Sequence, residues 1–166
     1  MEPIAYAVGE SEFRLFELVA RPNVNIQFGE RVYIGQDSSQ RTKIDHVKRR
    51  VKFFDLTPTA QGEIEYAVGE IVAQDEAKYV RFFNKAEGLS LKKHTLEELP
   101  GLGKKTMMAI LDERKKKEFE SFDDIAARVE GMKRPESYIV KRIILELSED
   151  DRKHYLFVPR DAPRRG

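Results

Sequence analysis

The sequence contains no cysteine, no tryptophan and no long apolar run. Without cysteine the chain can form neither a disulfide framework nor a cysteine-based zinc ribbon. No apolar stretch approaches the roughly 18 residues that a transmembrane helix needs. The N-terminal stretch has no basic segment followed by an apolar one, which a signal peptide requires. We therefore expect a soluble, cytoplasmic protein with no membrane partner.

Net charge is also small, because 30 lysines and arginines oppose 29 aspartates and glutamates in 166 residues. The charges are unevenly distributed. Residues 1–90 hold 12 basic and 14 acidic side chains, whereas residues 91–166 hold 18 and 15. The second half is thus mildly basic, but charge alone neither requires nor excludes a nucleic-acid partner.

The beginning of the chain predicts β-structure. Residues 4–34 contain four short segments that are rich in valine, isoleucine, phenylalanine and tyrosine and are separated by turn formers. This spacing is typical of strands joined by short loops. The segments are IAYAV, FRLFELVA, VNIQF and RVYIG. We expect them to form a small antiparallel sheet or a partial barrel.

The next segment, KIDHVKRRVKFFDL, is compatible with two structures. A strand would place Val47, Val51 and Phe53 on one face, whereas a helix would bring Ile44, Val47 and Val51 together. Basic residues at the centre of the segment are poor strand formers. We therefore favour a helix near residues 40–52.

Helical patterns dominate from residue 57 onward. Thr57 is a suitable N-cap and Pro58 suits the first helical position. Ile64, Val68 and Val72 then follow at helical spacing and predict one apolar face. A second helix is expected in AKYVRFFNKA, directly after this one.

The composition changes again near residues 87–93, and the remainder predicts an all-helical part. Two capping-box patterns mark helix starts, Thr95 with Glu98 and Ser121 with Asp124. Helices are expected at about residues 95–99, 104–117, 121–129 and 136–147.

The sequence Pro-Gly-Leu-Gly separates the first two of these helices. Glycine permits a left-handed turn and lets the backbone approach a ligand closely, and Gly101 and Gly103 flank Leu102 here. The first N–H groups of the following helix lack intrahelical partners and carry the positive end of the helix dipole. Lys104 and Lys105 add charge at this helix start, and Thr106 adds a hydroxyl group. The pattern predicts a phosphate site that carries no base information, although an ordinary helical hairpin with a glycine turn would look similar.

Thirty residues later the layout repeats. Gly131 and Met132 stand where Gly101 and Leu102 stood, and they are followed by Lys133 and Arg134. Lys133 replaces the second glycine, so this copy is degenerate. We expect the two copies to share one core of four helices. The second turn would then be structural, or would supply Lys133 and Arg134 as simple charges.

The first turn resembles the helix–hairpin–helix module. Residues 99–103 match its apolar–spacer–Gly–apolar–Gly pattern position by position, and Met107 stands where the module usually has a small residue. Such modules sometimes hold a monovalent cation at the hairpin. No other cofactor is expected.

The whole chain resembles an uncharacterised archaeal family that joins an OB-like β-barrel to a pair of these modules. The passages that carry this resemblance are FELV, GERVYIG, LTPTA, FFNKAE, LPGLGKK, FESFDDI and YLFV. The resemblance implies nucleic-acid binding in the setting of RNA processing, the ribosome or transcription. It implies no established activity.

An OB-like barrel would bind single strands through aromatic stacking and a basic groove. The candidate residues in the first part of the chain are Arg31, Tyr33, Lys48, Arg49 and Arg50. Two other interpretations remain. The aromatic residues of so small a barrel are mostly part of its core, and a basic run is often a solvated face without a binding role. Only four strands are evident where a complete barrel has five.

We find no sequence pattern for catalysis, since the three histidines have no metal-ligand spacing and no phosphate-binding or nucleophile motif occurs. We therefore expect an α+β protein, a small OB-like antiparallel β-barrel with accessory helices followed by an all-α tandem helix–hairpin–helix bundle. Its leading function is non-catalytic, largely sequence-independent binding of DNA or RNA. An enzyme with an unrecognised site and a protein-interaction adaptor are the alternatives. The expected divisions are a barrel at 1–56, connecting helices at 57–88, the tandem module at 89–158 and a flexible basic tail at 159–166.

Overall fold

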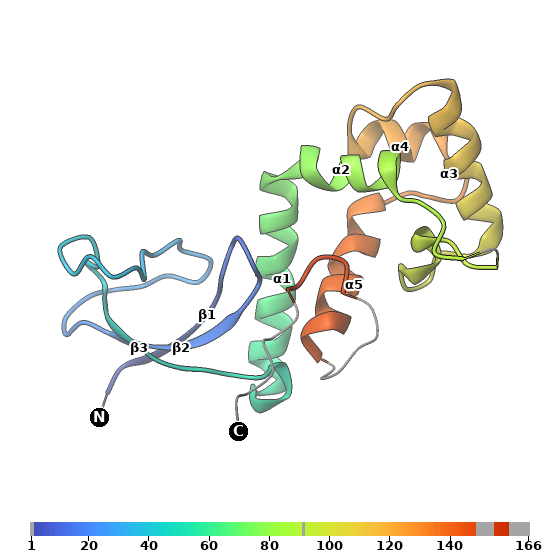
Figure 1. Cartoon of the computed structure of the whole chain (residues 1–166). Helices are drawn as coiled ribbons and strands as arrows, with labels where there is room; N and C mark the ends of the chain where they lie inside the picture. The colour runs from blue at the N-terminus through green and yellow to red at the C-terminus, as the bar shows by residue number, and fades with distance from the viewer. Residues whose placement is uncertain (1, 91, 149–154, 160–166) are drawn as a thin grey trace. The chain divides into compact units, whose positions relative to one another are not determined.

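Three antiparallel strands and five α-helices make up the described part of the chain, so the protein is α+β (Figure 1). The computed structural model describes residues 2–90, 92–148 and 155–159. The chain divides into two compact units, Met1–Ala67 with Leu147–Gly166, and Val68–Glu146. The expected basic tail lies outside the described residues from residue 160 onward.

The sheet of the first unit has the order β1-β2-β3, with β1 at Ile4–Val8, β2 at Leu15–Ala20 and β3 at Ile44–Arg50. The central strand is the most buried, since Leu15, Leu18 and Val19 all have exposed fractions of 6% or less. Both outer strands are more exposed than β2, because each pairs along one edge only.

The predicted barrel is wrong, because the described strands form an open three-stranded sheet. The segments VNIQF and RVYIG form no strand and belong to an irregular loop between β2 and β3. Side chains bind the carbonyl groups of this loop in place of a neighbouring strand. Arg21 Nε donates to the Arg41 carbonyl at 2.6 Å, and Arg41 Nη1 donates to the Gly35 carbonyl at 2.7 Å. Such bonds satisfy the backbone without extending the sheet.

The predicted helix near residues 40–52 is also wrong, because this segment forms β3. Ile44 is fully buried beside Ala20, and Val47 pairs with Leu18 of β2. The basic residues that disfavoured a strand lie at the exposed outer edge, where charged side chains are well tolerated. Pairing with β2 therefore outweighs local propensity. The strand ends at Arg50 and a single 3₁₀ turn follows at Phe53–Asp55.

Helix α1 spans Pro58–Gln74, and its predicted start is confirmed. The Ala60 N–H donates to Thr57 Oγ1 at 3.2 Å, so Thr57 caps the helix. The apolar stripe is buried as expected at Ile64, Val68 and Val72. Helix α2 follows at Glu76–Lys85.

All four predicted helical segments of the second unit are present, but the first is a short 3₁₀ helix at Thr95–Glu98. Its cap is His94 rather than Thr95, and the paired acid is Glu97. The α-helices are α3 at Lys104–Lys116, α4 at Phe122–Arg128 and α5 at Pro135–Ser148. They enclose a core of fully buried aliphatic side chains, which includes Leu96, Ile110, Ile125, Ile139 and Ile143.

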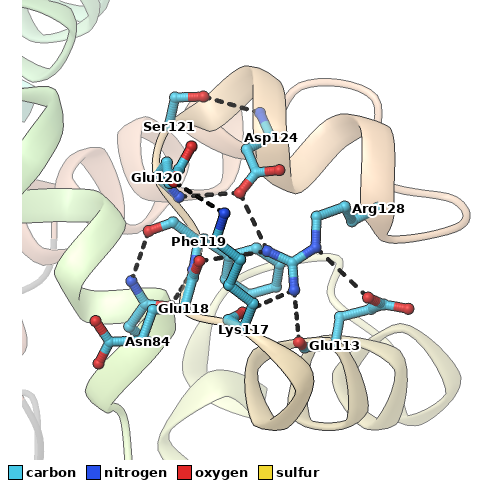
Figure 2. A network of polar contacts seen from close by, with 9 residues as sticks. All are labelled: Asn84, Glu113, Lys117, Glu118, Phe119, Glu120, Ser121, Asp124 and Arg128. Carbon is cyan, nitrogen blue, oxygen red and sulfur yellow. Dashed lines mark hydrogen bonds and ion pairs between the residues drawn. The ribbon is translucent and has the colours of Figure 1, made fainter.

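Arg128 fixes the connection between α3 and α4 (Figure 2). Its Nη2 donates to the carbonyl oxygens of Glu113 and Lys117 at 2.6 and 2.7 Å. The guanidinium also pairs with Asp124 at 3.1 Å and stacks 4.6 Å above the Phe119 ring. Carbonyl groups at the end of a helix run short of backbone donors. Arg128 supplies a donor to the Lys117 carbonyl directly after α3 and a second donor to the Glu113 carbonyl, which also accepts the Lys117 N–H.

Helix α2 is joined to the same connection through one amide side chain (Figure 2). Asn84 accepts the Phe119 N–H at 2.8 Å and donates to the Phe119 carbonyl at 3.0 Å. Glu76, at the start of α2, accepts the Phe122 N–H at 2.7 Å. Helix α2 is therefore an integral part of the helical unit.

An ionic cluster around the buried Arg142 links α5 to the 3₁₀ helix at Thr95–Glu98. Arg142 is 1% exposed and donates to Glu146 at 2.7 Å and to the Glu98 carbonyl at 3.0 Å. The Glu98 carboxylate also pairs with Arg142 at 3.3 Å and with Lys93 at 3.0 Å. Two cations and two anions thus balance one another in this cluster.

Candidate functional site

Two turns of the helical unit have the same backbone geometry. Gly101 has φ of +82° and Gly131 has φ of +83°, so both occupy the left-handed region that favours glycine. In each turn the N–H group of the residue after the glycine donates to the carbonyl oxygen of the residue two positions before the glycine. Leu102 donates to Leu99 at 3.2 Å, and Met132 donates to Val129 at 3.3 Å. These four apolar side chains are buried. Each turn is therefore held to the core by the residues that flank its glycine.

Each turn lies close to the helix that follows the other turn. A Cβ atom on Gly131 would lie 3.8 Å from Thr106 Oγ1, at the start of α3. A Cβ atom on Gly101 would lie 3.8 Å from Tyr138 Cε1, in α5. No sequence pattern singles out Tyr138, which lies seven residues after Gly131 in the first part of α5. The starts of α3 and α5 are thus neighbours in space.

Gly103 differs from Gly101 in what its position requires. Its φ of −82° and ψ of 169° are extended values that any residue adopts. A Cβ atom built there would meet no other atom within 4 Å. Neither backbone conformation nor crowding inside the protein therefore requires glycine at position 103, and the second turn indeed has Lys133 there.

Two lysines begin α3 directly after Gly103. Lys104 and Lys105 are both exposed, and Thr106 is half-buried beside them. Within the described residues neither lysine forms an ion pair. Their charges therefore add to the positive end of the α3 dipole without internal compensation.

The second turn carries a partly compensated charge. Lys133 is exposed, while Arg134 pairs with Glu136 at 3.5 Å. Glu130 stands immediately before Gly131 and adds a further negative charge. The cations of the second turn are consequently more compensated by their own sequence neighbours than Lys104 and Lys105 are.

The predicted basic residues of the first unit are mostly engaged in ion pairs. Arg31 pairs with Glu10 at 2.5 Å, Lys48 with Glu2 at 3.1 Å and Arg49 with the buried Glu17 at 2.5 Å. Arg50 is exposed but also has an interaction partner. Tyr33 is 43% exposed in the irregular loop. The structure does not gather these side chains into one uncompensated basic groove.

His94 lies at the entrance to the first turn, and sequence reasoning did not assign it a role. Its Nδ1 atom accepts the Leu96 N–H at 3.0 Å and caps the 3₁₀ helix. Burial, together with the nearby Arg114 guanidinium, lowers the pKa of His94. The neutral form is the one that can accept this hydrogen bond.

None of the described helices is long and apolar enough to cross a membrane.

The comparisons with known proteins place the chain in one class and then in one family. An α+β fold with a small antiparallel sheet and a helical unit recurs in a crystal structure of an Archaeoglobus fulgidus protein. That structure has 47% sequence identity and a TM-score of 0.89, and the match covers 95% of this chain and 86% of the other. The chain belongs to the DUF655 family of proteins of unknown function, whose family model matches residues 1–159. The Archaeoglobus protein is described as a member of the same family.

A second relative is an uncharacterized protein of Methanocaldococcus jannaschii. It is 49% identical over 158 residues, which cover 95% of this chain and 71% of the relative. Both relatives come from archaea, which agrees with the family resemblance that the sequence suggested.

Proposed function

We propose that this protein binds DNA or RNA without catalysis, and that it contacts backbone phosphates at the first turn. The supporting observation is the combination at the start of α3. Lys104 and Lys105 are exposed and uncompensated, and they follow a glycine whose missing side chain leaves open space. A phosphate placed there would accept hydrogen bonds from the first N–H groups of α3 and pair with both lysines.

The shared geometry of the two turns supports reading them as a tandem helix–hairpin–helix pair. Phosphate contacts of this kind orient a protein on nucleic acid but carry no sequence information. We therefore expect binding that is largely independent of sequence. The monovalent cation that such hairpins sometimes hold, and a setting in RNA processing, the ribosome or transcription, stay predictions.

Salt dependence gives the sharpest test of phosphate contact. Each neutralised phosphate of duplex DNA contributes about −0.9 to the slope of log affinity against log salt concentration. Three or four contacts predict a slope of roughly −2 to −4. Replacing both Lys104 and Lys105 with glutamine should weaken binding and make the slope less negative by about 2.

The matched control replaces Lys133 and Arg134 with glutamine, because it removes the same charge at the degenerate turn. It should change affinity and slope less. Anisotropy titrations with a labelled DNA duplex, a structured RNA and a single strand would measure both quantities. A wild-type slope near zero refutes the proposal. Formation of a cleaved or joined product with Mg²⁺ would instead favour an enzyme.

A further inference from the structure

Two exposed aromatic rings are in contact in the first unit. Phe28 comes from the irregular loop between β2 and β3, and Tyr66 comes from α1. Their ring centroids are 5.9 Å apart, yet Phe28 is 60% exposed and Tyr66 is 59% exposed. Single exposed apolar residues are common on protein surfaces. A contacting pair that leaves most of both rings open offers a continuous aromatic surface.

The helix beside Tyr66 is open as well. Gly62 lies one turn before Tyr66 in α1, and a Cβ atom there would meet nothing within 4 Å. Gly62 and Tyr66 are four residues apart and therefore lie on the same face of α1. No atom of the Tyr66 ring comes within 4 Å of the Cβ position at Gly62. Glycine lowers the stability of a helix interior relative to alanine. The position therefore leaves open space on the Tyr66 face of α1 without a benefit to the helix.

Negative charge lies on the α1 side of this open aromatic surface. Glu63 is exposed three residues before Tyr66, on the same face of α1. The helix contains two further glutamates, Glu65 and Glu70, and no lysine or arginine. Across the described residues none of these three carboxylates forms an ion pair. Such a surface repels phosphate and attracts cations, and the faces of aromatic rings also bind cations.

We propose that Phe28, Gly62, Glu63 and Tyr66, here called the Tyr66 surface, bind an arginine side chain in a basic segment of a partner protein. The guanidinium would stack on the rings and donate to the Glu63 carboxylate. Arginine suits the surface better than lysine does, because its planar group stacks on aromatic faces and is weakly hydrated. This inference is independent of the proposed function, since the charge preference of the Tyr66 surface is opposite to that of the first turn.

The probe is a fluorescein-labelled peptide of about ten residues with alternating arginine and glycine, titrated with the full chain at low salt. Tyr66→Ala and Phe28→Ala should each lower its affinity about two- to five-fold, as expected for an exposed cation–π contact. A peptide with lysine in place of arginine should bind more weakly than the arginine peptide.

Two further variants separate the Tyr66 surface from general acidity and from damage to the fold. Glu63→Gln should weaken binding more than its matched control Glu65→Gln, which removes the same charge from α1 but does not share a face with Tyr66. Gly62→Leu should raise the melting temperature, because leucine is a better helix former than glycine. It should nevertheless weaken binding, because its side chain fills the open space on the Tyr66 face of α1.

Three results would overturn the inference. Equal effects of Glu63→Gln and Glu65→Gln would mean that only net charge matters. Unchanged binding in Gly62→Leu and in Phe28→Ala, with both proteins folded, would mean that the surface is not used. Displacement of the peptide by a single-stranded oligonucleotide that binds Tyr66→Ala more weakly than the wild type would make the surface a base-stacking site.

Discussion

A pair of glycine substitutions separates the structural role of the first turn from its proposed binding role. Gly101 occupies the left-handed region with φ of +82°, so an alanine there is strained. The cost of left-handed backbone for an L-residue is about 1–2 kcal/mol. In a chain of this length each kcal/mol lowers the melting temperature by about 2–4 °C. Gly101→Ala should therefore lower it by about 2–8 °C.

Gly103→Ala should behave differently, because its backbone is extended and the Cβ position is open. Alanine is a poorer N-cap than glycine, but it also restricts the unfolded chain, which is worth about 0.4–1 kcal/mol of stability. These two effects have opposite signs, so we expect stability to change by less than about 0.5 kcal/mol.

Gly103→Ala, which should have the smaller effect on stability, should have the larger effect on nucleic-acid binding. The new methyl group at position 103 would occupy the space through which a phosphate reaches the N–H groups of α3. Loss of one charge-assisted hydrogen bond of about 1.5 kcal/mol lowers affinity about ten-fold. Thermal denaturation followed by circular dichroism and anisotropy titration with a DNA duplex measure the two effects. If Gly103→Ala binds as tightly as the wild type, close backbone approach is not part of the mechanism. If Gly101→Ala keeps its melting temperature, the left-handed turn is not a source of strain.

Two other predictions concern stability. Arg142→Leu leaves Glu98 and Glu146 without their shared cation and should cost about 3–5 kcal/mol in urea unfolding; adding Glu146→Leu should recover part of this loss, and no recovery would contradict the proposed cause. The pKa of His94 is lowered from its ordinary value of 6.5, so near this pH the folded protein binds fewer protons than the unfolded chain does. The stability that neutral His94 contributes is therefore fully present above pH 6.5 and is lost as pH falls toward the pKa of the folded state. His94→Asn keeps a capping oxygen and should flatten this part of the stability–pH curve, whereas a curve identical to that of the wild type would show that another group titrates.

Local signals in the sequence identified all five α-helices, although they also favoured a helix where β3 forms. Thr57 and Ser121 are short polar side chains directly before apolar periodic segments, and both accept a hydrogen bond at the predicted helix start. Glycine in a hairpin sequence likewise reports a backbone requirement, and Gly101 and Gly131 do adopt positive φ. These features depend only on residues within one or two turns, which is why a single sequence reveals them.

Features that depend on distant partners could not be predicted in the same way. Strand β3 contains mostly poor strand formers and is stabilised by pairing with β2, whose residues precede it by about 30 positions. The ion pairs that engage Arg31 and Arg49 likewise join separate segments, so the sequence does not reveal the acidic partners of these residues. The cap at His94 was missed for a different reason. A histidine nitrogen can replace the usual hydroxyl or carboxylate, and Thr95 beside it offered the more familiar pattern.

The contacts of Arg128 have a consequence for how the sequence of this protein can vary. Two of its shortest bonds go to backbone carbonyl oxygens, at Glu113 and Lys117, and not to side chains. Every residue type supplies a carbonyl, so the identity of the side chain at position 117 contributes nothing to its bond. Position 117 can therefore change in sequence and keep its bond to Arg128, whereas Phe119 and Asp124 contribute their side chains to the same joint.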